Sequence, residues 1–241
     1  MVVRCDSCGF AYLPEAPTYE ELQSDFEWDT SARAEKKRRK RERPVLSWLD
    51  AQTRWRLHIF PRPETHIFMQ KLAPRGGRIL DVGCGDGRHG LRLGEAYTPF
   101  GVEISQPLGE AADAAFRPLG GAALTAPALE GISRFDDGYF SGAMLNSYLE
   151  HEIDPAGVLE AMQPKLAKDG VAVVKVPNFG SLNAAVMKQN WCGVRLPDHV
   201  NYFTTNTLSD MAHRLGYTVE FPAAANLPTN DNFWAFLRPC A

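Results

Sequence analysis

The sequence has little of what a membrane-spanning, secreted or disulfide-stapled protein requires. No apolar run approaches the ~18 residues needed to cross a bilayer, and residues 1–5 lack the apolar stretch of a secretory signal. The five cysteines form an odd and scattered set, at positions 5, 8, 84, 192 and 240, which is unlike a disulfide framework. These absences predict a cytoplasmic protein with no membrane partner.

The chain also lacks a large excess of either charge. Its formal net charge is −3, which argues against a nucleic-acid binder that relies on its overall field. Two local blocks cancel within this total: residues 14–30 hold six acids and no base, and residues 31–43 hold eight bases against two acids. The basic block is either a nucleic-acid arm or a solvated helix face. Because no aromatics interleave with the bases, we favour the helix face and expect no nucleic-acid partner.

What the chain does have is enough apolar material for a core, since 44% of its 241 residues are hydrophobic. We predict two parts. Residues 1–61 form an N-terminal extension, with a short hairpin or knuckle at 1–13, a charged helix from Thr18 and an amphipathic helix over 45–60. Residues 62–241 form one α/β domain.

From residue 78 onward, short apolar strands alternate with helical segments, which is typical of a parallel sheet covered by helices. Strands are predicted at 78–82, 98–104, 121–126, 139–145 and 171–176, with a terminal pair at 217–221 and 232–237. Helices are predicted at 64–72, 88–95, after Ser105, from Asp154 to about 168, and at 204–215.

The most informative segment is the turn after the first of these strands. Asp81 ends an apolar run, and Gly83, Gly85 and Gly87 follow at alternate positions before a helix. Glycines allow a sharp turn and the close approach of a ligand to the free amides of a helix N-terminus. The dinucleotide-binding pattern G-x-G-x-x-G fails, because Arg88 stands where its third glycine is required.

The pattern D-x-G-x-G-x-G resembles instead the first motif of class I S-adenosylmethionine-dependent methyltransferases. Glu103, at the end of the second strand, stands where that family holds the ribose hydroxyls of its cofactor. Downstream, Glu150-His151, Val176-Pro177-Asn178 and a W…P-x-H-x-x-x-F segment running from Trp191 to Phe203 resemble the group that includes ubiquinone-pathway O-methyltransferases and sugar and natural-product methyltransferases.

The resemblance implies a Rossmann-like, seven-stranded, mostly parallel sheet with helices on both faces, beside the helical N-terminal extension. It also implies S-adenosylmethionine as the cofactor and a set of binding residues around it. These residues are Asp81, Gly83, Cys84, Gly85, Gly87, Glu103, Ile104, Leu129, Leu145 and Asn146.

Methyl transfer from a sulfonium needs an aligned nucleophile and little covalent help from the protein. An oxygen or nitrogen nucleophile can also require a base, and histidine is the usual one. His151 and His199 follow strands at the carboxyl edge of the expected sheet, so we predict them as catalytic residues, with anchoring of their loops as the alternative.

Cys5 and Cys8 resemble one knuckle of the zinc ribbon that precedes some methyltransferases of this group. A structural zinc site needs four ligands, and the sequence has no second C-x-x-C pair. The pair is therefore a remnant without metal, or one half of a site shared between subunits. We predict no metal.

The function predicted from the sequence is methyl transfer from S-adenosylmethionine to a small-molecule acceptor with an oxygen or nitrogen nucleophile, such as a sugar or another metabolite. The alternative is a non-catalytic module that binds the cofactor, RNA or a protein on the same fold. The sequence predicts neither the acceptor nor the oligomeric state.

Overall fold

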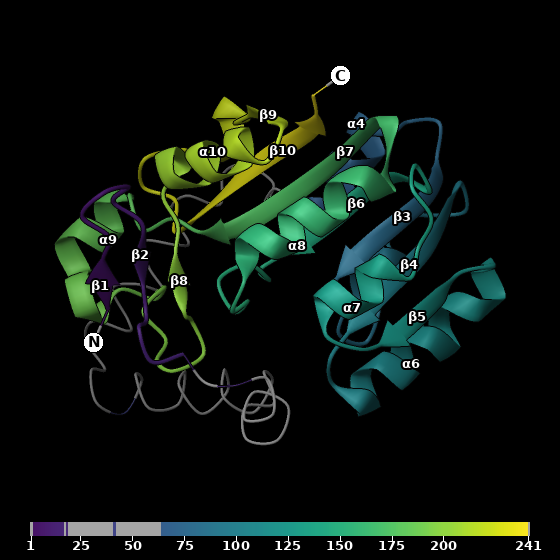
Figure 1. The fold of residues 1–241 in the computed structure, drawn as a ribbon, viewed down its shortest axis with the longest axis horizontal. Helices are drawn as coiled ribbons and strands as arrows, with labels where there is room; N and C mark the ends of the chain where they lie inside the picture. Colours follow the sequence, from purple (N-terminus) through teal and green to yellow (C-terminus); the bar gives the residue numbers. More distant parts are fainter. Residues whose placement is uncertain (1, 17, 19–40, 42–63, 241) are drawn as a thin grey trace.

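A seven-stranded sheet runs through the middle of the protein (Figure 1). The computed structural model describes residues 2–16, 18, 41 and 64–240. In spatial order the strands are β5, β4, β3, β6, β7, β10 and β9. Their bounds are β3 Gly77–Val82, β4 Tyr97–Glu103, β5 Ala122–Thr125, β6 Phe140–Asn146, β7 Leu166–Pro177, β9 Tyr217–Glu220 and β10 Asn232–Pro239.

Only β10 runs against the other strands of this sheet. The pairs β5–β4, β4–β3, β3–β6 and β6–β7 are parallel, whereas β10 is antiparallel to both β7 and β9. The chain passes from β3 outward to β4 and β5 and then returns to β6 on the other side of β3. Ligands of open α/β sheets bind outside the carboxyl ends of the strands at such a reversal.

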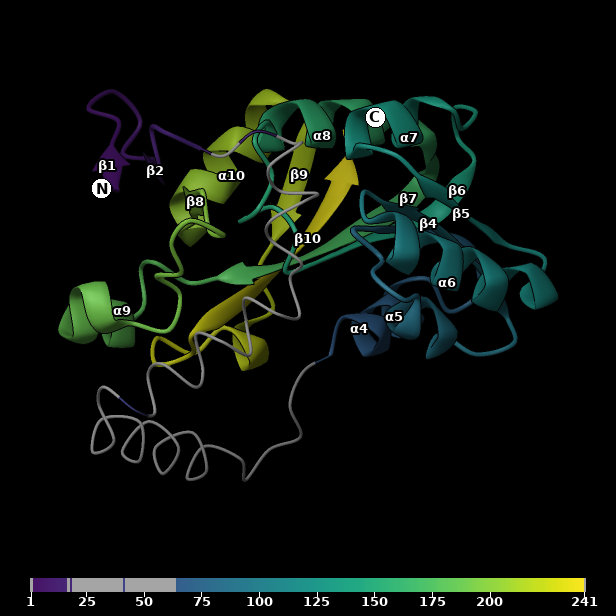
Figure 2. The ribbon, with the colours of Figure 1, turned by 90° about the horizontal axis from the view of Figure 1, so that it is seen from below.

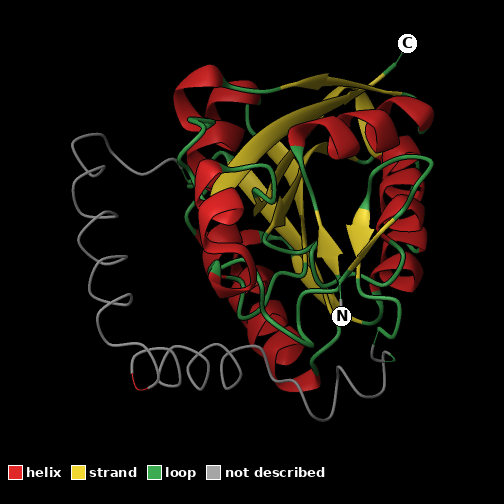
Figure 3. Cartoon of the chain, turned by 90° about the vertical axis from the view of Figure 1, so that its left-hand side faces the viewer, coloured by secondary structure: helices red, strands yellow, loops and turns green. Residues whose placement is uncertain are grey.

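Helices cover both faces of the sheet (Figures 2 and 3). One group lies on the first face: α4 Thr65–Leu72, α5 Arg88–Leu91 and α6 Gln106–Phe116. The opposite group is α7 Ala128–Ser133, α8 Pro155–Met162 and α10 Thr205–Arg214. A further helix, α9 Leu182–Met187, lies away from the sheet beside the N-terminal strands (Figure 1).

The alternation of side chains along each strand produces two buried layers. In β3, Leu80 packs into the core layer shared with α7, α8 and α10, whereas Ile79 packs with Met69 of α4. In β10, Phe233 and Trp234 divide between the same two layers. This two-residue period is that of a strand buried on both faces. Short apolar runs predicted these strands, and the α/β fold class predicted for the domain is confirmed.

Two predicted helices are shorter than expected. The helix predicted at 88–95 ends at Leu91 in a segment that contains Gly94, whose φ is +89°. The helix after Asp154 ends at Met162, where the chain passes into a 3₁₀ turn over Gln163–Lys165 that contains Pro164. Helices α7 and α9 were not predicted from the sequence.

The N-terminal hairpin joins a second, small sheet. β1 Val3–Arg4 pairs with β2 Ala11–Tyr12, and β2 also pairs with β8 Asn201–Tyr202 near the end of the chain. The hairpin predicted at 1–13 is therefore present. The helices predicted from Thr18 and over 45–60, and the predicted domain boundary at 61/62, involve residues outside the described ones.

Within the described ranges, every helix is too short or too polar to cross a membrane.

Candidate functional site

The turn between β3 and α5 needs glycine at three alternate positions. Gly83, Gly85 and Gly87 have φ angles of +68°, +55° and +81°, in the left-handed region that costs other residues free energy. The turn is held in place from below, since the amide of Gly83 donates to the carbonyl of Val102 in β4 at 2.8 Å.

The three glycines face different surroundings. A Cβ at Gly83 would lie 2.3 Å from the ring of Tyr148, and one at Gly87 would lie 2.8 Å from the ring of Phe116. A Cβ at Gly85 would meet no atom within 4 Å. Gly85 therefore presents bare backbone to open space, which is what a ligand resting on the turn requires.

The structure brings Glu103 to this open position. Its two carboxylate oxygens accept hydrogen bonds from the amides of Gly85 at 2.8 Å and Ser105 at 3.0 Å. Ser105 is the N-cap residue of α6, as predicted, but its side chain makes no capping bond. The carboxylate is thus fixed at the carboxyl end of β4, directly beside the glycine turn.

Asp81 lies beneath the turn and is almost inaccessible, with 2% of its surface exposed. Its Oδ2 has no hydrogen-bond partner among the described residues. Burial, and secondly the charge of Glu103, raise the pKa of Asp81 to about 8. The side chain is therefore a neutral carboxylic acid at neutral pH, inside the fold and not at its surface.

Four other predicted cofactor residues differ in where their side chains lie. Cys84 is buried under β4, where its Sγ would be 2.5 Å from a Cβ at Gly101, and burial raises the pKa of its thiol. Leu145 is fully buried in the core. Ile104, just after β4, and Leu129, in α7, are partly exposed. Cys84 and Leu145 can therefore meet a ligand only through their backbones.

Asn146 ends β6 and is held from two sides. Its Oδ1 accepts a hydrogen bond from the Thr65 hydroxyl at 2.7 Å, and its Nδ2 lies 3.1 Å from Nε2 of His89. Burial lowers the pKa of His89, which favours the neutral ring that can accept this hydrogen bond. Both partners come from helices on the same face of the sheet, and sequence reasoning missed them because the contacts are long-range.

The two predicted catalytic histidines lie together, with ring centroids 4.7 Å apart. Nδ1 of His151 lies 2.8 Å from the carbonyl of Asp198, and Nδ1 of His199 lies 2.8 Å from the carbonyl of Gly193. A carbonyl only accepts hydrogen bonds, so each Nδ1 carries a ring hydrogen, and a neutral ring then has its lone pair at Nε2. Burial lowers the pKa of His151 to about 4, which keeps its ring neutral.

Sequence reasoning did not select Glu150 and Lys175, which lie at the same place. Glu150 is 1% exposed, and burial raises its pKa to about 7. Burial lowers the pKa of Lys175, while the charge of Glu150 opposes that shift. The signals were present, since Glu150 precedes His151 and Lys175 lies near the end of the most apolar strand.

A pocket of about 190 Å³ opens at these residues. It is lined by Ser147, Glu150, His151, Pro177, Cys192, Gly193, Arg195, His199, Asp231 and Asn232. The lining residues come from the loops after β6 and β7, from the segment before β8 and from the start of β10. The predicted W…P-x-H-x-x-x-F segment therefore forms one wall of the pocket.

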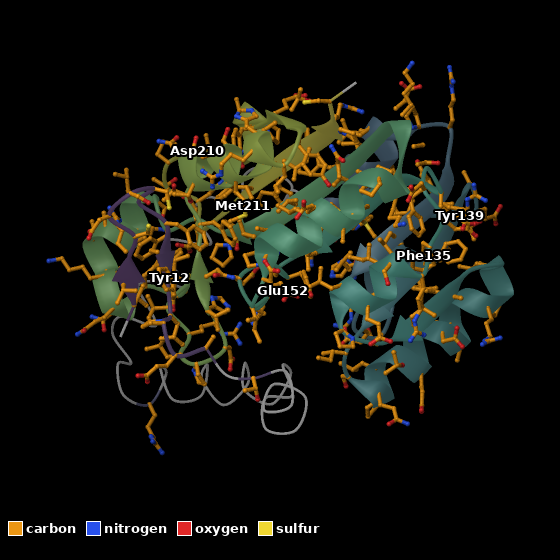
Figure 4. All side chains as sticks on the ribbon, in the orientation of Figure 1. Tyr12, Phe135, Tyr139, Glu152, Asp210 and Met211 are labelled. Carbon is orange, nitrogen blue, oxygen red and sulfur yellow. The ribbon has the colours of Figure 1, made fainter. Side chains whose placement is uncertain are left out.

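Backbone hydrogen bonds dock that segment onto the loop after β6. The amides of Val200 and Asn201 both donate to the carbonyl of Glu150, at 2.8 and 3.1 Å. The Asn201 side chain donates to the carbonyls of Leu149 and Glu152, at 3.0 and 2.6 Å. Figure 4 shows Glu152 near the carboxyl end of β6, opposite Phe135 and Tyr139 at its amino end.

The turn and the pocket lie along one edge of the sheet. Val82 of β3 is in register with Val102 of β4, and Asn146 of β6 is in register with Lys175 of β7. Neighbouring strands are about 4.8 Å apart, so four adjacent strand ends span about 15 Å. A ligand of nucleoside size over the turn can therefore reach the mouth of the pocket.

The predicted cysteine knuckle occupies the turn of the N-terminal hairpin. Sγ of Cys5 lies 3.2 Å from the Ser7 hydroxyl, and hydrogen bonding, first from that side chain, lowers the pKa of Cys5 to about 7. None of the five cysteines, all of them among the described residues, forms a disulfide bond. In the part of the chain that the structure describes, the knuckle belongs to no cluster of three or more metal-ligating side chains.

Comparison with solved structures shows the same fold in several methyltransferases. A Burkholderia thailandensis 1,6-didemethyltoxoflavin-N1-methyltransferase with bound S-adenosylhomocysteine superimposes with a TM-score of 0.58 at 17% identity, covering 100% of this chain and 99% of that one. A TehB-like S-adenosylmethionine-dependent methyltransferase from Corynebacterium glutamicum gives 0.56 at 20% identity, covering 81% and 99%. An Archaeoglobus fulgidus S-adenosylmethionine-dependent methyltransferase gives 0.56 at 18%, covering 71% and 91%.

No curated protein matches the sequence. A protein family described as "Methyltransferase domain" matches residues 52–220, which is more than half of the chain. The match contains the glycine turn, Glu103 and the pocket segment. The chain therefore belongs to the family of S-adenosylmethionine-dependent methyltransferase domains.

Proposed function

We propose that this protein transfers the methyl group of S-adenosylmethionine to an oxygen or nitrogen atom of a small molecule, such as a sugar or another metabolite. The observation that carries the proposal is the placement of a carboxylate and a bare glycine turn on the same strand edge as a pocket lined by two imidazoles. The carboxylate and the glycine turn suit the cofactor, and the pocket suits the acceptor.

The residues present fit the cofactor. Gly85 leaves open space above the turn, and Glu103 offers two carboxylate oxygens that can accept hydrogen bonds from ribose hydroxyls. Asn146, fixed by Thr65 and His89, faces the methionine half in this assignment. When bound, S-adenosylmethionine supplies an electrophilic methyl group on a sulfonium.

The acceptor occupies the pocket beside Ser147. His151 and His199 hold it and take up the proton of its nucleophile at Nε2, since their Nδ1 atoms are committed to backbone carbonyls. Transfer of the methyl group to a hydroxyl releases one proton and converts the charged sulfonium into a neutral thioether. A base near the nucleophile therefore assists the reaction.

Trp191 forms part of the cover that excludes water from this pocket. Its ring is 1% exposed, and its Nε1 donates to Asp231 Oδ1 at 2.8 Å. The helix predicted over 45–60, which we assign to the same cover, lies outside the described residues. We also propose a cytoplasmic location, since the odd and scattered set of five cysteines is unlike a disulfide framework.

Calorimetric titration with S-adenosylhomocysteine tests the proposal. We expect one site in the full chain and a loss of about ten- to a hundredfold in affinity for Glu103→Ala, because two hydroxyls lose a charged acceptor. The matched control is Glu95→Ala, which removes an exposed carboxylate from the loop before β4. Unchanged affinity in Glu103→Ala would refute the ribose assignment.

Failure of the full chain to bind either S-adenosylmethionine or its product would refute the enzymatic function. The fold would then serve as a binding module. If RNA binds to the basic block in that case, its affinity should fall steeply with salt concentration.

A further inference from the structure

We propose that Glu150, His151 and His199 bind a divalent transition-metal ion at the floor of the acceptor pocket. The binding of the ion stands on the geometry of these three side chains alone. Its role in the reaction rests on the proposed function.

The three side chains already converge. Each offers one ligand atom, and these atoms all lie within 4.8 Å of one another. Three ligands of one tetrahedral ion with bonds of about 2.1 Å are about 3.4 Å from one another. Shifts of up to roughly 0.8 Å in each side chain therefore bring all three into coordination, and the adjoining pocket leaves room for them.

Both imidazoles are oriented as metal ligands are. His151 gives its Nδ1 hydrogen to the carbonyl of Asp198, and His199 gives its own to the carbonyl of Gly193. Metal-binding histidines almost always use the second ring nitrogen in this way, which fixes the ring and directs a lone pair at the ion. Neither ring needs to turn or change tautomer to bind.

Two of the converging atoms lack a hydrogen-bond partner within the described ranges. Nε2 of His151 and Oε2 of Glu150 are buried and have no hydrogen-bond partner among the described residues. Acceptors left in this state cost free energy, and acceptors that face one another repel. A proton would bind to only one of the three ligand atoms, whereas a metal ion binds to all three.

The charges around the pocket allow a cation to enter. Arg195 lies 3.2 Å from Asp198 in an ion pair, and the charge of Lys175 is opposed by that of Glu150. Asp231 adds a further carboxylate to the lining. The local cations are thus matched by carboxylates before the ion binds.

The ligand set indicates the class of metal. Two imidazole nitrogens and one carboxylate suit Zn²⁺, Mn²⁺, Fe²⁺ or Co²⁺, whereas Mg²⁺ and Ca²⁺ prefer oxygen. Three protein ligands leave positions open to the pocket. With the ion bound, the two imidazoles serve as its ligands in place of the base role proposed above. An acceptor hydroxyl bound to the ion loses its proton to solvent more readily, and its oxygen forms the O–CH₃ bond as the S–CH₃ bond breaks.

Titration of the full chain with Co²⁺ and Zn²⁺ tests the site after chelation has removed bound metal. All variants carry Cys5→Ser and Cys8→Ser, so that the exposed knuckle does not contribute. We expect one Co²⁺ per chain with visible absorption bands, and the same stoichiometry for Zn²⁺ by calorimetry. Glu150→Gln and His199→Gln should each weaken binding at least tenfold, since each removes a ligand.

The matched control is His213→Gln, which removes an exposed histidine from α10 and should leave the affinity unchanged. Glu150→Gln keeps the size of the side chain, so it tests the site even if His199→Gln does not fold. Absence of metal binding, or equal affinity in Glu150→Gln and its parent, would overturn the proposal. Binding of S-adenosylhomocysteine, measured on the same samples, tests the proposed function separately.

Discussion

At the scale of single residues, Gly85 is the position where backbone conformation and ligand access meet. Its φ of +55° is costly for any side chain, and a Cβ there would point into open space. The Gly85 amide donates a hydrogen bond to the Glu103 carboxylate, which places Glu103 at the same site. A change at this position therefore affects both folding and binding, by separable amounts.

We expect Gly85→Ala to lower the free energy of unfolding by about 1–2 kcal/mol, the cost of a left-handed alanine. It should also weaken the binding of S-adenosylhomocysteine at least tenfold, because the methyl group occupies the space above the turn. Urea denaturation measures the first effect and calorimetry the second.

Gly120→Ala is the matched control. Gly120 has a φ of +78° and also faces open space, but it lies in the turn before β5, remote from the glycine turn. Its substitution should cost similar stability and leave binding unchanged. Equal loss of binding in both variants would show that strain alone, and not occupied space, explains the effect at Gly85.

At the scale of elements, α10 begins with a reciprocal cap that its sequence specifies. The Thr204 hydroxyl accepts from the amide of Thr207 at 3.1 Å, and the Thr207 hydroxyl accepts from the amide of Thr204 at 3.0 Å. Both amides would otherwise lack partners at the helix start. This cap also fixes the end of the segment that carries His199.

Thr204→Ala should lower the free energy of unfolding by about 1 kcal/mol, the usual cost of a lost N-cap. In a chain of this size, such a change lowers Tm by about 2–4 °C. Asp210→Ala, on the exposed side of the same helix (Figure 4), should stay within about 0.5 kcal/mol of the parent. If the two variants are equally stable, the cap contributes nothing measurable.

Helices and strands were predicted well where nearby residues in the chain determine them. They were predicted less well where pairing with a distant segment determines them. The apolar run of β10 and the Asp154-Pro155 start of α8 are local, and both were predicted. In the structure the Asp154 side chain accepts from the amide of Gly157 at 2.8 Å. The strand predicted at 171–176 instead begins at Leu166, because Leu166 pairs with Phe140 across a register shift. No local pattern reveals such a pairing.

At the scale of the whole molecule, burial of Asp81 couples stability to pH. The folded pKa of about 8 lies above the unfolded value near 3.8. Below the unfolded pKa, Asp81 is protonated in both the folded and the unfolded state, and its full contribution to stability is present. As pH rises toward 8, the unfolded state releases its proton first, so stability falls by up to about 1.4 kcal/mol per pH unit.

We expect Asp81→Asn to remove this part of the pH dependence, since an amide does not titrate. Relative to the parent, the variant should gain stability steadily between pH 5 and pH 8 in urea denaturation. Asp169→Asn, at an exposed position in β7, is the matched control and should follow the parent curve. Parallel curves for Asp81→Asn and the parent would show that the buried carboxyl does not titrate in this range.

The sequence by itself determined the sheet, the glycine turn and the position of Glu103, because apolar runs, glycine spacing and strand ends follow from residues close together in the chain. Only the tertiary structure decided what surrounds Asn146 and which side chains join His151. Thr65 reaches Asn146 from α4, and His199 reaches Glu150 only after the segment before β8 docks on the loop after β6. These contacts depend on long-range packing and backbone hydrogen bonding, which no spacing in the sequence encodes.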